Sequence, residues 1–155
     1  MQARVLGAVR HASAAAAFLF MTFPATPSLA DSALAVGLPA DVGNDGFASG
    51  FQLNAPDMDT ARKGAISGCQ KSVGASDAAK KLCKVVATFK NQCFSVAIDP
   101  KDGTPGVGWS IAENQDQADA QAIAQCRTTA GAGREQFCIV MEGRGTNRGC
   151  DGNAK

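Results

Sequence analysis

The stretch Gly64-Ala65-Ile66-Ser67-Gly68-Cys69 indicates an internal repeat, because a similar stretch follows 57 residues later as Gln121-Ala122-Ile123-Ala124-Gln125-Cys126. The six cysteines around it form two sets of three, at Cys69, Cys83, Cys93 and at Cys126, Cys138, Cys150. The third cysteines of the two sets are also 57 positions apart. We interpret the chain as one supersecondary unit used twice, over about residues 32–93 and 94–150.

Both halves carry the same series of local patterns. A short apolar run is followed by turn residues, Asn44-Asp45-Gly46 in the first half and Asp102 to Gly106 in the second, which are typical of a hairpin. Asp57 and Asn114 are natural helix N-caps, and they predict helices over about 58–72 and 115–129. A final strand closes each half, over 83–90 and near 137–142.

These patterns predict an α+β fold of two ββαβ repeats. The simplest assembly is one mixed sheet with two helices packed on one face, stapled by disulfides. We expect the tail after Asp151 to be mobile.

The predicted strands have two unlike faces. One face carries large apolar side chains such as Leu34, Phe94 and Trp109, and the other carries small residues such as Ala35 and Ala97. Because successive strand residues point to opposite faces, the small residues form a nearly flat surface. Either the helices pack closely on this surface, or it meets solvent or a partner.

Residues 1–30 have the pattern of a secretory signal peptide, which leaves residues 31–155 as a single secreted domain. Arg4 and Arg10 precede an uncharged apolar stretch, and Ser28-Leu29-Ala30 ends in the small residues that a signal peptidase recognises. The alternative is an uncleaved membrane anchor, although the stretch is short for a membrane span of about 20 residues. We expect cleavage before Asp31, a secreted or periplasmic location, and no stable membrane insertion afterwards.

Charge and residue content exclude several functions. The first 30 residues hold two of the 15 basic residues and none of the 14 acidic ones, so the remainder has one more acid than base. This balance argues against a nucleic-acid partner. The only histidine is His11, within the predicted leader. The exported domain therefore lacks the histidine that Ser-His-Asp and Cys-His catalysis and imidazole-ligated metal sites require.

Six cysteines in an exported chain predict three disulfides. Cys83 lies on the apolar face of its strand, where Cys69 of the helix would lie, so we pair Cys69 with Cys83 and, by repetition, Cys126 with Cys138. Cys93 and Cys150 remain and would tie the two halves together. Because six cysteines allow about 15 connectivities, this pairing is a hypothesis. Zinc is disfavoured, since no CxxC pair exists.

The motifs resemble those of the bacterial secreted family catalogued as domain of unknown function 4189. They are Gly108-Trp109-Ser110, the Ala-rich run from Ala118 to Cys126, Cys83-Lys84-Val85-Val86 and Cys93. The resemblance covers roughly residues 33–150. It implies export from bacterial cells and a compact α+β domain, and it brings no catalytic residue to carry over. This chain departs from an exact repeat of the aromatic motif, with Phe51-Gln52 opposite Gly108-Trp109.

Basic residues and one aromatic residue make up a possible binding surface. Lys84 and Lys90 flank the last strand of the first half, and Arg127 and Arg144 belong to the second half. They could contact an anionic partner or could form an ordinary solvated face. Trp109 shares a strand parity with neighbouring apolar residues, so it is a core residue or a binding platform.

Carboxylates are the remaining general acid–base groups. Those at the predicted helix starts are explained by the helix dipole. The only glutamates are Glu113, Glu135 and Glu142, and their spacing singles out no catalytic pair. The two acids in the turn from Asp99 to Asp102 are too few for a calcium loop. We therefore expect no metal and no cofactor.

The sequence favours a non-enzymatic module that binds a protein or a cell-envelope component. A small carboxylate-dependent envelope hydrolase, resembling a glycosidase and using Glu113 and Glu135, is the alternative. A structural envelope protein without a discrete ligand is a third possibility.

Overall fold

The computed structural model describes residues 31–140 and 147–155. Its strands are β1 (Asp31–Gly37), β2 (Ala48–Ala55), β3 (Lys84–Phe89), β4 (Cys93–Ile98), β5 (Val107–Ala112), β6 (Ile139–Val140) and β7 (Arg148–Cys150). Its helices are α1 (Val42–Asp45), α2 (Met58–Gln70), α3 (Asp77–Lys81), α4 (Gln115–Thr129) and the 3-10 turn η1 (Glu135–Phe137). The α+β class predicted from the sequence is confirmed.

The strands form two antiparallel sheets, so the prediction of one mixed sheet is wrong. The first sheet has the order β2-β1-β3, and in the second β4 pairs with β5 on one side and with β6 and β7 on the other. Every pairing among the described residues is antiparallel. The chain passes from the first sheet to the second at residues 90–92, between β3 and β4, so each half keeps its strands in its own sheet.

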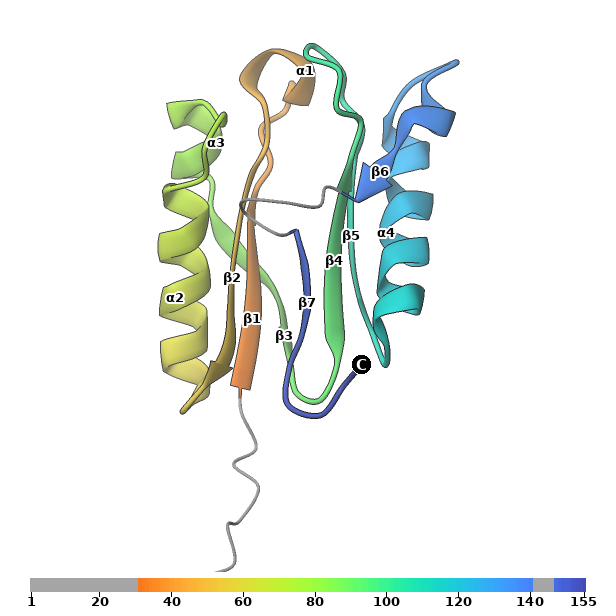
Figure 1. The fold of residues 1–155 in the computed structure, drawn as a ribbon. Coiled ribbons are helices and arrows are strands. Elements are labelled where there is room, and N and C mark those ends of the chain that lie inside the picture. Colours follow the sequence, from red (N-terminus) through yellow and green to blue (C-terminus); the bar gives the residue numbers. More distant parts are fainter. Residues whose placement is uncertain (1–30, 141–146) are drawn as a thin grey trace, which may run out of the picture.

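The layers run helix, sheet, sheet, helix, as Figure 1 shows. Helix α2 covers the outer face of the first sheet and α4 covers the outer face of the second. The expectation of both helices on one face is therefore also wrong. The physical reason is the large apolar face of each half, which a single sheet would have left uncovered and which the other half buries here.

The layer between the sheets is built from the large apolar side chains. Leu34, Val36, Phe94 and Val96 are at most 1% exposed. Phe51 lies 4.6 Å from Phe94 between ring centroids, which is a favourable aromatic contact. This layer holds the two halves together through apolar burial.

The small residues lie on the outer faces, under the helices. Ala35 and Ala97 are fully buried, in clusters with α2 and α4 respectively. A Cβ added to Gly50 would lie 1.9 Å from the backbone nitrogen of Cys69, and one added to Gly108 would lie 2.3 Å from the carbonyl oxygen of Ala122. Of the two alternatives for the flat surface, close helix packing is the one that the structure shows.

Both long helices begin at the predicted caps. The Asp57 carboxylate accepts a hydrogen bond from Thr60 N–H at 2.8 Å, and the Asn114 side chain accepts one from Gln117 N–H at 3.0 Å. Helix α4 has the predicted bounds, and α2 ends two residues earlier than predicted. The turn at residues 44–46 contains the short helix α1 rather than a bare hairpin turn.

The three disulfides join Cys69 to Cys83, Cys93 to Cys150 and Cys126 to Cys138. These are the pairs that the sequence predicts. The first and third each fasten a helix to the segment that follows it, whereas the second lies directly across β4 and β7. Three disulfides indicate an oxidising, extracytoplasmic compartment.

The C-terminal segment is docked, contrary to the expectation of a mobile tail. Asp151 is 0% exposed, and the carbonyl oxygen of Lys155 accepts a hydrogen bond from Gln115 N–H at 3.1 Å. The segment is held because it follows β7, a strand that the sequence analysis did not predict.

When the short helices α1, α3 and η1 and the strand β7 are set aside, the two halves share the element order strand, strand, helix, strand. Their duplication from one unit stays a prediction. The leader at 1–30, Glu142 and Arg144 lie outside the described residues.

Candidate functional site

The structure places the basic residues named from the sequence on separate elements. Lys84 and Lys90 are exposed at the two ends of β3, an edge strand of the first sheet, and Lys90 forms an ion pair with Asp31 at 2.6 Å. Lysines at an edge strand disfavour pairing with another chain. Arg127 is exposed near the end of α4, on the opposite outer layer. Arg144 lies outside the described residues.

Trp109 lies on β5 and is half-buried against the layer between the sheets. Glu113 precedes α4 and Glu135 follows it, so the two glutamates lie beyond opposite ends of a helix about 22 Å long. A glycosidase pair needs about 5–9.5 Å between its carboxyl groups. These two residues therefore do not form such a pair.

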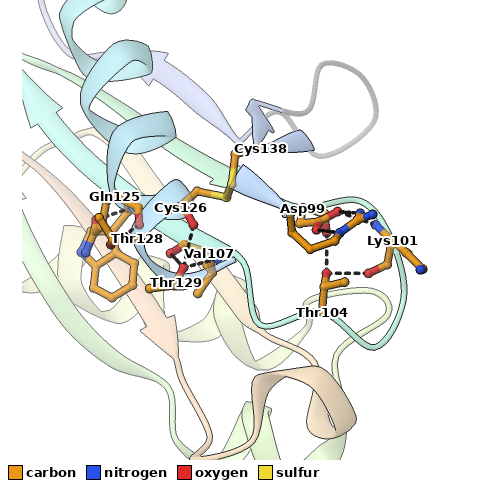
Figure 2. Close-up of a disulfide and its surroundings, with 11 residues drawn as sticks. Asp99, Lys101, Thr104, Val107, Gln125, Cys126, Thr128, Thr129 and Cys138 are labelled. Carbon is orange, nitrogen blue, oxygen red and sulfur yellow. Dashed lines mark hydrogen bonds and ion pairs between the residues drawn. A yellow bond between two sulfur atoms is a disulfide. The ribbon is translucent and has the colours of Figure 1, made fainter. Parts of the chain in front are cut away.

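The free edge of β5 is closed by side chains from α4. Thr129 Oγ1 accepts a hydrogen bond from Val107 N–H at 2.8 Å and donates to the Val107 carbonyl oxygen at 2.8 Å. Gln125 Oε1 accepts from Trp109 N–H at 2.7 Å. Figure 2 shows Thr129 against Val107, beside the disulfide between Cys126 and Cys138. Three outward backbone groups of this edge strand, the Val107 N–H and carbonyl and the Trp109 N–H, are thus satisfied within the chain.

Among residues 31–140 and 147–155, the corresponding edge of β2 is less well covered. Ser72 Oγ accepts from Ser49 N–H at a long 3.5 Å, in the place where Thr129 meets Val107. Phe51 N–H points to the same side of the strand as Ser49 N–H, because strand residues two apart are equivalent. Among the described residues, no side chain accepts a hydrogen bond from Phe51 N–H. The reason is Gly68, which stands 57 positions before Gln125 and has no side chain.

Gly68 also brings the helix close to the strand. A Cβ added there would lie 3.4 Å from Gly50 Cα and 3.6 Å from the Phe51 nitrogen, so there is room for a side chain at ordinary contact distance. At Gly64, one turn earlier, the side chain of Gln52 already fills the corresponding space, 2.7 Å from such a Cβ. Within the part of the chain that the structure describes, Gly68 is therefore the position at which no helix side chain covers the edge.

A groove of about 410 Å³ lies along this edge. Its wall is formed by the edge of β2 and the C-terminal end of α2. The rings of Phe47 and Phe51 line it, and Ile98 and Asn147 contribute from more distant parts of the chain. The lining residues are Phe47, Ser49, Gly50, Phe51, Gly68, Lys71, Ser72, Val73, Ile98 and Asn147. Val73 is 99% exposed at its rim.

A second hollow of about 600 Å³ adjoins the groove and shares Phe47, Val73 and Ile98 with it. Its walls are the α1 turn, residues 73–76 and the loop between β4 and β5. The loop is fixed by Asp99, whose carboxylate accepts two hydrogen bonds from Arg134. These bonds hold the pKa of Asp99 below its ordinary value of 3.8, and the same pairing raises the pKa of Arg134. The hollow beside the groove is therefore bounded by a loop that this ion pair fastens to the segment after α4.

The site was not among the residues that the sequence analysis named, although its signal is in the repeated stretch. The two copies differ at three positions, Gly64 against Gln121, Ser67 against Ala124 and Gly68 against Gln125, and two of these replace a glycine by a glutamine. Positions four apart share one face of a helix. The glycines thus mark the side of α2 where the edge of β2 is less covered.

The chemistry available in the groove is that of binding. It offers a backbone donor, apolar walls and the ammonium group of the exposed Lys71. Within residues 31–140 and 147–155, no group of three His, Cys, Asp or Glu side chains could hold a metal ion. No helix in this described part is long and apolar enough to cross a membrane.

The fold and the three disulfides define a small two-sheet α+β domain stapled by disulfides. The sequence model of the family described as Domain of unknown function (DUF4189) matches residues 33–141. The chain therefore belongs to this family, as its motifs suggested. The chain matches no curated protein and no solved structure.

Proposed function

We propose that this protein is an exported binding module that captures an extended segment of another protein along the free edge of β2. The observation that carries the proposal is the contrast between Gly68 and Gln125. In the second half the glutamine side chain satisfies the edge donor, at 2.7 Å from Trp109 nitrogen. In the first half the equivalent donor, Phe51 N–H, faces a groove of about 410 Å³.

The chemistry of the groove matches an extended peptide. A peptide strand can supply a carbonyl oxygen to an edge N–H, while its alternate side chains enter pockets beside the strand. Here Phe47, Phe51 and Ile98 would receive an apolar side chain, and Lys71 would attract an acidic one. Main-chain hydrogen bonds would give the affinity. The apolar residues of the groove and Lys71 would give the specificity.

The test is Gly68→Gln, which supplies the side chain that closes the other edge. Mature, oxidised protein would be used to select binders from a phage-displayed library of random peptides. We expect selected peptides to bind wild-type protein and to lose at least tenfold in affinity for Gly68→Gln. The matched control is Arg62→Gln, which also introduces a glutamine into α2, but at an exposed position.

Hydrogen exchange locates the binding. The amide of Phe51 should become protected when a selected peptide is added. Equal affinity for wild-type and Gly68→Gln, or protection confined to other segments, would contradict the proposal. The same variants, immobilised and exposed to envelope and medium proteins of the source cells, would then identify the natural partner by a loss specific to Gly68→Gln.

The hydrolase alternative has less support, since Glu113 and Glu135 lie beyond opposite ends of α4. It predicts cell-wall hydrolysis that falls when these two residues are changed to glutamine.

A further inference from the structure

The start of β1 and the C-terminal segment meet at Asn54. The backbone N–H of Asn54 donates to Ser32 Oγ at 3.0 Å, and its side-chain oxygen accepts from Gly152 N–H at 2.9 Å. Asp31 and Asp151 each directly precede one of these partners. Figure 1 shows the start of β1 and the chain after β7 at the same end of the molecule.

Asp151 is a buried carboxylate without a partner. The residue is 0% exposed, and neither of its carboxylate oxygens has a hydrogen-bond partner within the described residues. Only its backbone is engaged, because its N–H donates to the Gln92 carbonyl oxygen at 2.9 Å. A buried charge is unfavourable unless it is paired. The site therefore calls for a positively charged group.

The segment that carries Asp151 is held firmly in place. Gly152 has a φ of 62°, and a Cβ added to it would lie 2.3 Å from Asn91 Oδ1. The neighbouring disulfide joins Cys150 to Cys93, at the start of β4. The carboxylate cannot reach solvent without moving this fastened segment.

No lysine or arginine forms an ion pair with Asp151 in the part of the chain that the structure describes. Of the basic residues near this end, Lys90 pairs with the side chain of Asp31 at 2.6 Å and is 45% exposed, and Lys155, four residues after Asp151, is exposed. The sequence, however, predicts cleavage between Ala30 and Asp31. Hydrolysis of that amide would add the hydroxyl of water to the Ala30 carbonyl carbon and leave the nitrogen of Asp31 as a protonated amine.

We propose that the α-ammonium group released at Asp31 by leader cleavage forms a buried ion pair with Asp151. Asp31 is 8% exposed while it is still joined to Ala30, and it begins β1, so the new charge would be carried by the first residue of a strand in the sheet. The uncleaved chain has a neutral amide at this position and leaves Asp151 unpaired. Removal of the leader therefore completes the fold. This inference rests on the predicted cleavage site and is independent of the proposed binding at β2.

The test is a double-mutant cycle on the oxidised domain. Two N-terminal forms would be prepared, one starting at Asp31 and one retaining Ala30, each with Asp151 and with Asp151→Asn. We expect Asp151→Asn to raise the unfolding equilibrium constant at least tenfold more in the form that starts at Asp31. Equal effects in both forms would overturn the ion pair. Equal stabilisation of both forms by calcium chloride, without coupling, would overturn it in favour of a metal ion.

A second measurement does not depend on the folding of the variants. In the wild-type domain that starts at Asp31, the α-amine should react with an acylating reagent at least tenfold more slowly in the native than in the unfolded state. Equal labelling rates would contradict its burial. N-terminal sequencing of the exported protein must give Asp31, and any other terminus would overturn the inference.

Discussion

Arg134 holds Asp99 at two points, with Nε 2.7 Å from Oδ2 and Nη2 2.6 Å from Oδ1. The guanidinium also lies 4.2 Å from the centroid of the Phe137 ring. The carboxylate is fully buried, while the arginine side chain is 25% exposed. This pair fastens the loop between β4 and β5 to the segment after α4, and so it fixes one wall of the hollow beside the groove.

The pair predicts a specific acid sensitivity. The pKa of Asp99 is lowered from 3.8, mainly by the hydrogen bonds from Arg134. A lowered folded-state pKa contributes stability that is present above the unfolded-state value and is lost as pH falls through the folded-state value. Arg134→Gln should therefore be less stable than wild type at pH 6, and the difference should shrink below about pH 4. Urea unfolding at a series of pH values measures it, and a pH-independent difference would contradict this assignment.

Because the Thr129 hydroxyl closes the edge of β5, we expect its removal to lower the stability of the protein. Thr129→Val keeps the shape of the side chain but leaves the N–H and carbonyl groups of Val107 without their partner. We expect a loss of about 1–3 kcal/mol in the free energy of unfolding.

Thr128→Val is the matched control for this substitution. Its hydroxyl donates only to the Gln125 carbonyl oxygen, at an exposed position, and the change should stay within about 0.5 kcal/mol. Thermal unfolding of both variants measures the two losses of stability. Equal losses would show that the hydrogen bonds between Thr129 and Val107 contribute nothing specific.

Local patterns were sufficient to predict the two long helices, their caps and the disulfides, but not the short helices α1 and α3. Asp57 and Asn114 each cap a helix through a contact three residues away, and Cys69 and Cys83 are joined within one half. The arrangement of the halves was not predictable in this way. Strand periodicity marks an apolar face but does not say which surface covers it, and the pairing of Phe51 with Phe94 joins residues of different halves.

The groove was missed for a related reason. Its signal is a pair of glycines in α2, and a glycine in a helix has many explanations. Only the register of β2 against the helix shows that Gly68 lies over Phe51 N–H, whereas Gln125 meets Trp109 N–H. The basic residues that the sequence analysis named have no such geometric link, and their role as a surface stays a prediction.

We expect removal of different disulfides to lower the free energy of unfolding by different amounts. The bond from Cys93 to Cys150 spans 57 residues and that from Cys126 to Cys138 spans 12. In the chain-entropy description the longer loop contributes about 4 kcal/mol and the shorter about 3 kcal/mol. Replacing both cysteines of each pair by alanine and measuring urea unfolding compares them. A larger loss for the short loop would show that local contacts, rather than loop closure, dominate.

Gly50 and Gly68 face each other across the contact between β2 and α2, yet they predict opposite effects of the same substitution. A Cβ at Gly50 would lie 1.9 Å from the Cys69 nitrogen, so Gly50→Ala must push the helix away from the sheet. We expect a loss of about 3 kcal/mol or more, in the upper range for overpacking. A Cβ at Gly68 would lie at ordinary contact distance, 3.4 Å from Gly50 Cα.

Gly68→Ala should therefore stabilise the protein by about 0.5–1 kcal/mol, because alanine is the better helix former. Its methyl group cannot accept a hydrogen bond, so Phe51 N–H should stay available and peptide binding should survive, in contrast to Gly68→Gln. Urea unfolding and peptide affinity, measured on Gly50→Ala, Gly68→Ala and Gly68→Gln, separate the effect on stability from the effect on binding. A loss of binding in Gly68→Ala would mean that the space beside the strand, and not its free N–H, receives the ligand.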